Sequence, residues 1–83
     1  DVVKKFGKNP KCYLSGEEID ITKPRTYNFD HIIPVSRGGS STLENLGICT
    51  SDANQAKSDK TPDEFLYLCK KILEYNGYEV IKP

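Results

Sequence analysis

The chain has 83 residues, of which 36 % are hydrophobic and 29 % are charged, and its 12 basic and 12 acidic side chains give a formal net charge of zero. This length predicts one domain with a small core over residues 1–83. No apolar run approaches the roughly 18 residues that a spanning helix needs, so we expect no membrane segment and no membrane partner. The neutral charge argues against a domain that holds nucleic acid by bulk electrostatics alone.

The first residue and the cysteine content bear on the origin of the chain. It begins with Asp1 and contains no methionine, so we expect a piece of a longer protein with no signal peptide of its own. Three cysteines cannot all pair with one another. We interpret Cys12, Cys49 and Cys69 as reduced thiols of a cytoplasmic protein.

Short elements are predicted in the first half of the chain. Residues 1–6 fit the end of a helix that Gly7 would stop. Residues 11–14 predict a short strand. Residues 26–33 contain aromatic and β-branched side chains and predict a second strand, which ends at Pro34 because proline has no N–H for the ladder.

A glycine loop, a returning strand and a short helix are predicted next. The pair Gly38-Gly39 allows backbone angles that other residues resist. Residues 46–49 are apolar and predict the returning strand of a hairpin. Ser51 is a plausible N-cap for a short helix over residues 52–58.

The clearest helix is predicted over about residues 62–76. Thr61 is its N-cap, with proline at the first helical position and Glu64 completing a capping box. Gly77 is a stop signal, and residues 78–81 could add an edge strand. One helical face is apolar and is expected to pack on the core; it consists of Phe65, Leu68, Cys69, Ile72 and Leu73.

Candidate catalytic and metal-binding residues lie in the predicted hairpin and the short helix. Asp30 and His31 are neighbours in the strand predicted over residues 26–33, and Asn54 lies in the short helix. If the helix packs back on the hairpin, these three side chains converge. A carboxylate and an amide oxygen suit Mg²⁺ or Mn²⁺, and a neutral imidazole beside the ion can take a proton from water near pH 7. Such groups suffice for hydrolysis of a phosphodiester.

Each of these residues also has a purely structural interpretation. A lone histidine in an apolar strand is often a hydrogen-bonded structural residue, and asparagines often cap backbone groups. Neighbouring strand residues point to opposite faces. Asp30 and His31 can therefore share a site only if the strand twists or ends at that point.

Taken together, the stretch DHIIPVSRGG, Asn45 within LENL and Asn54 within NQAK resemble the HNH family of endonucleases over roughly residues 11–60. The resemblance implies a ββα-metal core, here over residues 26–60. We therefore expect a small α+β domain, made of a β-hairpin and a short helix, with the longer C-terminal helix packed on it.

The resemblance also implies a role for each site residue. Asp30 and Asn54 are expected to hold one divalent cation, Mg²⁺ or Mn²⁺, and His31 is expected to be the general base. Asn45 is expected to support catalysis by tying the loop so that the histidine ring is held in place. The residues expected to contact phosphate groups of DNA are Lys57 and, as a weaker candidate, Arg37.

Many members of that family brace the fold with a zinc ion held by two Cys-x-x-Cys pairs. The corresponding positions here hold Cys12, Ser15, Thr50 and Ala53. Because Zn²⁺ needs four close ligands, we predict no structural zinc. Cys12 and Cys49 are expected to pack as small hydrophobic side chains, and the C-terminal helix to supply core instead.

These features predict a metal-dependent DNA endonuclease domain that cuts one strand per active site. The alternatives are a non-catalytic nucleic-acid-binding module of the same fold and a structural protein-interaction domain. The neutral charge predicts that other domains of the parent protein, an oligomer or a guide RNA supply affinity and specificity. A restriction, homing or phage nuclease, a toxin and an RNA-guided effector are all compatible with the sequence.

Overall fold

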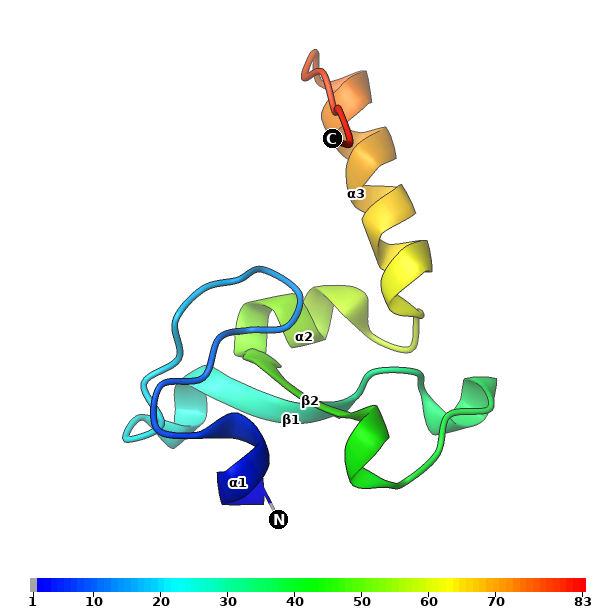
Figure 1. Cartoon of the computed structure of the whole chain (residues 1–83). Helices are drawn as coiled ribbons and strands as arrows, with labels where there is room; N and C mark the ends of the chain where they lie inside the picture. Colours follow the sequence, from blue (N-terminus) through cyan, green and yellow to red (C-terminus); the bar gives the residue numbers. More distant parts are fainter. Residues whose placement is uncertain (1) are drawn as a thin grey trace.

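The computed structural model describes residues 2–83 and contains a two-stranded antiparallel sheet, α-helices and short 3₁₀ turns (Figure 1). The two strands and the second helix follow one another directly, which gives the ββα order. The predicted α+β domain of a hairpin, a short helix and a longer C-terminal helix is confirmed. The elements are α1 (Val2–Phe6), β1 (Tyr27–His31), β2 (Leu46–Thr50), α2 (Ser51–Lys57) and α3 (Pro62–Tyr75). Position 1 of the expected first helix lies outside the described residues.

The hairpin pairs β1 with β2 from Tyr27 opposite Thr50 to His31 opposite Leu46. Strand β1 ends two residues earlier than predicted. The reason lies in the loop, because the Ile33 N–H donates to the side-chain oxygen of Asn45 at 2.9 Å instead of to a strand partner. The β1–β2 ladder therefore ends before Ile33, because the Asn45 side chain accepts the hydrogen bond that a strand partner would otherwise accept.

The strand predicted over residues 11–14 is wrong. Only one isolated bridge forms there, between Lys11 and Glu18. The Gly16 N–H turns back to donate to the Cys12 carbonyl at 2.9 Å, so the chain reverses before a ladder can grow. The Tyr13 N–H donates to the Ile48 carbonyl at 3.0 Å and attaches this loop to β2.

The core is small and lies between this loop, β2 and the first turn of α2. Its buried apolar residues are Cys12, Ile19, Ile48 and Cys49, and Phe6, Tyr13, Leu14, Tyr27 and Ala53 pack against them. Cys12 and Cys49 have no disulfide. Both pack as small hydrophobic side chains, as predicted.

Both predicted helices form, with one shift of register. Helix α2 begins one residue earlier than expected because Thr50, not Ser51, is the N-cap; its hydroxyl accepts from the Ala53 N–H at 3.2 Å. Helix α3 has the predicted capping box, in which Thr61 and Glu64 each bond the other's backbone. It ends before Gly77, which has a φ of 91°.

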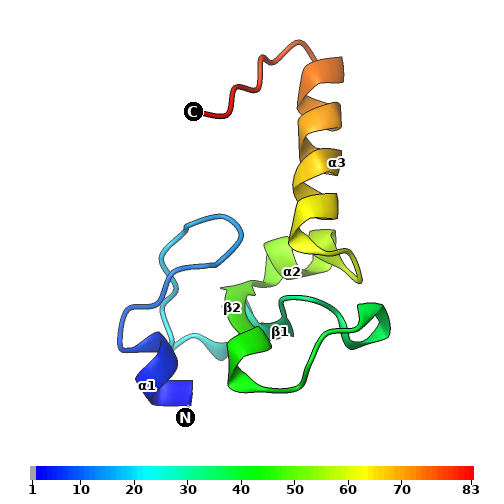
Figure 2. The ribbon, with the colours of Figure 1, turned by 45° about the vertical axis from the view of Figure 1, so that its right-hand side comes forward.

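The predicted packing of α3 on the core is wrong. The helix projects away from the hairpin and joins the rest of the domain at its first turn (Figures 1 and 2). Within it no residue is fully buried, and Ile72 and Leu73 of the predicted core face are exposed. Its apolar side chains instead line a groove of ≈ 550 Å³ with the C-terminal residues Val80 and Ile81.

The edge strand predicted over residues 78–81 is also wrong. These residues have no regular structure. The hairpin lies beyond the other end of α3, so the segment has no strand with which to pair (Figure 2). Within residues 2–83, no helix combines the length and the apolar character needed to cross a membrane.

Candidate active site

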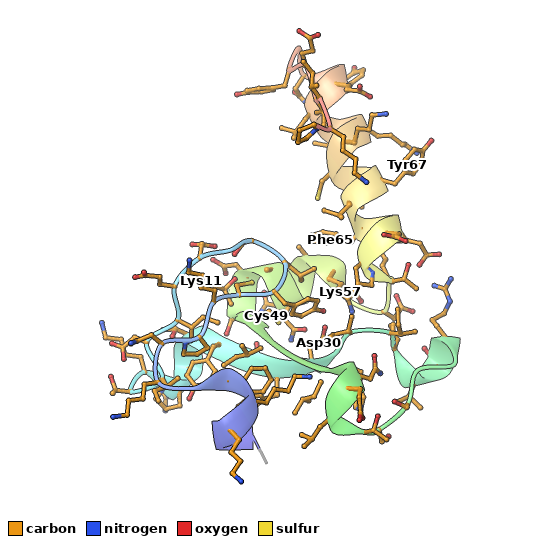
Figure 3. All side chains as sticks on the ribbon, in the orientation of Figure 1. Lys11, Asp30, Cys49, Lys57, Phe65 and Tyr67 are labelled. Atoms are coloured by element: carbon orange, nitrogen blue, oxygen red, sulfur yellow. The ribbon has the colours of Figure 1, made fainter. Side chains whose placement is uncertain are left out.

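The Asp30 carboxylate has polar partners from two separate parts of the chain. It lies in β1 opposite Gly47. Its Oδ2 accepts from the Tyr13 hydroxyl at 2.6 Å and lies 3.1 Å from the Lys57 ammonium. Figure 3 shows Asp30 and Lys57 side by side between the hairpin and α2. The carboxylate therefore links the N-terminal loop, β1 and α2.

A glycine makes room for the tyrosine. A Cβ atom on Gly47 would lie 2.6 Å from Cδ1 and 2.8 Å from Cε1 of the Tyr13 ring. The ring therefore lies directly over the Gly47 backbone and reaches across β2 to Asp30. Sequence reasoning missed Tyr13 as a site residue. The available signal was the lone glycine in β2, because a glycine inside a strand often marks a close approach by another group.

Lys57 is fully buried, with 0 % of its surface exposed. Its ammonium donates to the His31 carbonyl at 3.3 Å as well as pairing with Asp30. The expected direct contact between Lys57 and phosphate is therefore corrected, because a buried, paired ammonium presents no surface to DNA. A buried charge of this kind requires a charged partner, and Asp30 is that partner.

The surroundings of Asp30 also alter the titration of two neighbours. Burial, and then the hydrogen bond to the Asp30 carboxylate, raise the pKa of Tyr13 well above its usual range. Tyr13 is therefore a hydroxyl donor at neutral pH. Burial, and then the charge of Asp30, raise the pKa of Cys49 to about 11. The Cys49 side chain is therefore a neutral thiol at neutral pH.

His31 is the last residue of β1 and is half-buried. Its imidazole makes no hydrogen bond or ion pair with another residue of the described part of the chain. In residues 2–83, every buried side-chain nitrogen or oxygen has a partner. The ring nitrogens are therefore open to solvent, as a base that acts on water requires.

Asn45 closes the loop between the two strands. Its side-chain oxygen accepts from the Ile33 N–H at 2.9 Å, and its amide nitrogen donates to the carbonyls of Ile33 and Ser40, both at 2.8 Å. Gly39 lies against this clamp, because a Cβ there would lie 1.8 Å from the Ile33 carbonyl oxygen and 2.8 Å from Nδ2 of Asn45. The side chain therefore ties the two ends of this loop together.

Asn54 lies on α2 one turn before Lys57, so both side chains belong to the same side of the helix. It is half-buried, and its amide has no partner among the described residues. The amide oxygen and Oδ1 of Asp30 are therefore two unpaired oxygens that reach solvent.

This donor set fits Mg²⁺, which usually takes one or two protein oxygens and keeps several waters. Within residues 2–83, no group of three or more His, Cys, Asp or Glu side chains is placed so that it could hold a metal ion. The two oxygens of Asp30 and Asn54 are thus the groups that could hold the ion, with water completing its coordination.

Arg37 is engaged by α3. Its guanidinium forms two hydrogen bonds with the Glu64 carboxylate, at 2.7 and 2.6 Å. The hydrogen bond to Arg37, followed by the one from the Thr61 backbone, lowers the pKa of Glu64 to about 2. The expected phosphate contact of Arg37 would require this pair to open, so the geometry gives Arg37 the role of a link between the glycine loop and α3.

The four positions that correspond to a zinc site in the resembling family lie close to one another at the edge of the core. Sγ of Cys12 accepts from the backbone N–H groups of Ser15 and Thr50, both at 3.4 Å. Thr50 in turn caps α2 at Ala53. Cys12 and Thr50 thus both make hydrogen bonds to the backbone at these positions.

Comparison with known proteins places these residues in a family. The sequence profile of the HNH endonuclease family matches residues 12–63. The CRISPR-associated endonuclease Cas9 of Listeria innocua serovar 6a is 33 % identical over 71 residues, which are 86 % of this chain and 5 % of that protein. The CRISPR-associated endonuclease Cas9 of Streptococcus mutans serotype c is 34 % identical over 56 residues, which are 68 % of this chain and 4 % of that protein. The chain spans only a small part of these relatives, and its family match over more than half of its own length shows that it belongs to the HNH endonuclease family.

Proposed function

We propose that the chain is a metal-dependent DNA endonuclease domain that hydrolyses one phosphodiester bond per active site. The observation that carries this proposal is the contact of the Lys57 ammonium with both the Asp30 carboxylate and the His31 carbonyl. This contact brings α2, with Asn54 one turn earlier, against the end of β1. In this proposal the Asp30 carboxylate, the Asn54 amide and the solvent-open His31 imidazole act on the same phosphate group.

His31 is the general base of this proposal. Its neutral imidazole takes a proton from a water molecule as the water oxygen bonds to phosphorus. The bond from phosphorus to the 3′ oxygen breaks, and the departing oxygen takes a proton from a second water molecule, which leaves a 5′-phosphate and a 3′-hydroxyl. A divalent cation bound by Asp30 and Asn54 would supply positive charge against the phosphoryl and leaving oxygens.

Asn45 supports this arrangement from the loop. Its three hydrogen bonds join Ile33 to Ser40 across the base of the loop that follows His31. The backbone that leaves β1 is thereby fixed, and with it the direction in which the His31 ring is presented. Asn45 is thus a positioning residue in this account.

Target selection is proposed to come from outside the chain. The formal net charge is zero, Lys57 is buried and Arg37 is paired with Glu64. Few basic side chains near the site are therefore free to bind the phosphate groups of DNA. Two relatives are named CRISPR-associated endonucleases, which supports a role within a longer protein that is guided to DNA by RNA.

Metal-dependent nicking of a supercoiled plasmid by the 83-residue chain tests the proposal. We expect nicking in Mg²⁺ or Mn²⁺, loss of nicking with a chelator, and strong loss in Asn54→Ala. Gln55→Ala is the matched control, because Gln55 is the exposed neighbour on α2. Equal rates for Asn54→Ala and Gln55→Ala would contradict the assigned role of Asn54, and DNA binding without any nicking would favour a non-catalytic binding module.

A further inference from the structure

We infer that Tyr13 is a positioning residue of the active site, which holds Oδ2 of Asp30 so that Oδ1 alone is offered to a ligand. The inference rests on the proposed function, because it concerns how Asp30 is presented. Oδ2 already has two partners: the Tyr13 hydroxyl donates to it at 2.6 Å, and the Lys57 ammonium forms an ion pair with it at 3.1 Å. Within residues 2–83, no group bonds to Oδ1.

Tyr13 is itself fixed at three points. Its backbone N–H donates to the Ile48 carbonyl at 3.0 Å. Its ring lies over Gly47, where a Cβ would come within 2.6 Å. Its hydroxyl then meets the residue directly opposite Gly47 in the hairpin, which is Asp30. Backbone, ring and hydroxyl thus define one position for the carboxylate oxygen.

The hydroxyl is the closer of the two partners of Oδ2. An O–H group bonded to a carboxylate at 2.5–2.7 Å is a short, charge-assisted hydrogen bond, stronger than a neutral one. The longer Lys57 contact supplies charge, but a lysine ammonium has no preferred plane, whereas the tyrosine ring sets a direction. Tyr13 therefore determines the rotation of the Asp30 carboxyl group more tightly than Lys57 does.

Packing alone does not account for the tyrosine. A phenylalanine would fill the same space over Gly47 and keep the backbone bond to Ile48. The hydroxyl contributes only the bond to Asp30. Partners that hydrogen-bond a metal-ligating carboxylate typically change metal affinity by about 10- to 100-fold when removed. Tyr13→Phe consequently separates positioning from packing.

Direct binding of Mn²⁺ to the 83-residue chain, measured without DNA by electron paramagnetic resonance of the free ion, tests the inference. We expect Tyr13→Phe to remain folded and to bind Mn²⁺ about 10- to 100-fold more weakly. Tyr27→Phe is the matched control, because the Tyr27 hydroxyl donates to the Ile21 carbonyl at 3.0 Å, away from Asp30; its affinity should equal that of the unmodified chain. Asp30→Asn should bind most weakly.

A second readout needs no metal. The ¹³C resonance of the Asp30 carboxyl carbon should move in Tyr13→Phe and stay in place in Tyr27→Phe. Gly47→Ala, which displaces the ring while keeping the hydroxyl, should move the same resonance and weaken Mn²⁺ binding. It provides a second variant if Tyr13→Phe does not fold.

The outcomes distinguish the inference from the proposed function. Unchanged Mn²⁺ affinity in Tyr13→Phe, together with weakened binding in Asp30→Asn, would overturn the role of Tyr13 and leave the nuclease proposal standing. Unchanged binding in Asp30→Asn would overturn the metal-binding role of Asp30, and the inference with it.

Discussion

Lys57 carries a charge into the interior of a domain whose core otherwise consists of small and apolar side chains. The side chain gains an ion pair with Asp30 and a hydrogen bond to the His31 carbonyl. Removal of one partner from such a pair leaves the other charge uncompensated. At the scale of the residue, the site is therefore also part of what holds α2 to the hairpin.

Replacement of Lys57 by methionine tests this dual role. We expect Lys57→Met to lower the free energy of unfolding by about 3–5 kcal/mol, the usual cost of breaking a buried pair, as measured by urea denaturation. Lys70→Met, at an exposed position of α3, is the control and should change it little. A direct phosphate contact would give the opposite pattern, with unchanged stability and a salt-dependent loss of DNA affinity.

Asn45 gives a second prediction at the residue scale. Asn45→Ala removes three hydrogen bonds and leaves the Ile33 N–H without its acceptor. Stability should fall by about 1–3 kcal/mol, and exchange of the Ile33 amide hydrogen should accelerate. Asn28→Ala, at an exposed position of β1, should leave that amide protected. Slow exchange at Ile33 in Asn45→Ala would show that the loop closes without the clamp.

At the scale of the element, α3 is tied to the domain by its first turn. Glu64 completes the capping box and also bonds both guanidinium nitrogens of Arg37. The rest of the helix makes no comparable attachment, and its side chains are exposed or half-buried. The attachment of α3 therefore depends on one carboxylate.

The pKa of Glu64, lowered to about 2 chiefly by the hydrogen bond from Arg37, predicts a pH effect. A carboxyl group with a lowered folded-state pKa contributes stability that is present above its ordinary pKa of 4.5 and is lost as pH falls toward 2. The helical circular dichroism and the Thr61 amide resonance should report this loss. Glu64→Gln should remove that step; a step of equal size in Glu64→Gln would assign it to another carboxyl group.

The local elements could be predicted because their signals are local. Thr61 with Glu64 predicted the start of α3 correctly, and the apolar run around Ile48 predicted the returning strand. The N-cap of α2 was missed by one residue because Thr50 and Ser51 are both good caps. The strand over residues 11–14 was wrong because a turn at Gly16, not a partner strand, satisfies its backbone.

The contacts that shape the site depend on tertiary structure. The sequence identified Asp30, His31, Asn45 and Asn54 as one group, but pattern alone could not show that Lys57 turns inward. Tyr13 is 17 positions from Asp30. Its role depends on Gly47, which has no side chain to hold the ring away. The exposure of the apolar face of α3 could not be predicted either. Helical periodicity shows that a face is apolar, but it does not show what covers that face.

At the scale of the whole molecule, the side chains at the positions of the family's zinc site make contacts within the protein. Sγ of Cys12 accepts two backbone hydrogen bonds, and Cys49 has a pKa raised to about 11 by burial and the charge of Asp30. We predict that purified chain contains no stoichiometric zinc by elemental analysis. The chelator used to stop nicking should then leave the melting temperature unchanged. One zinc ion per chain would contradict this prediction.

The central claim is that His31, at the open end of β1, is the base that activates water beside Asp30. The most direct measurement is the initial rate of Mg²⁺-dependent plasmid nicking by His31→Ala, with DNA binding and melting temperature followed in parallel. The account predicts a loss of about 10²- to 10⁴-fold in rate, with DNA binding and stability nearly unchanged. A rate within a few-fold of the unmodified chain would contradict it.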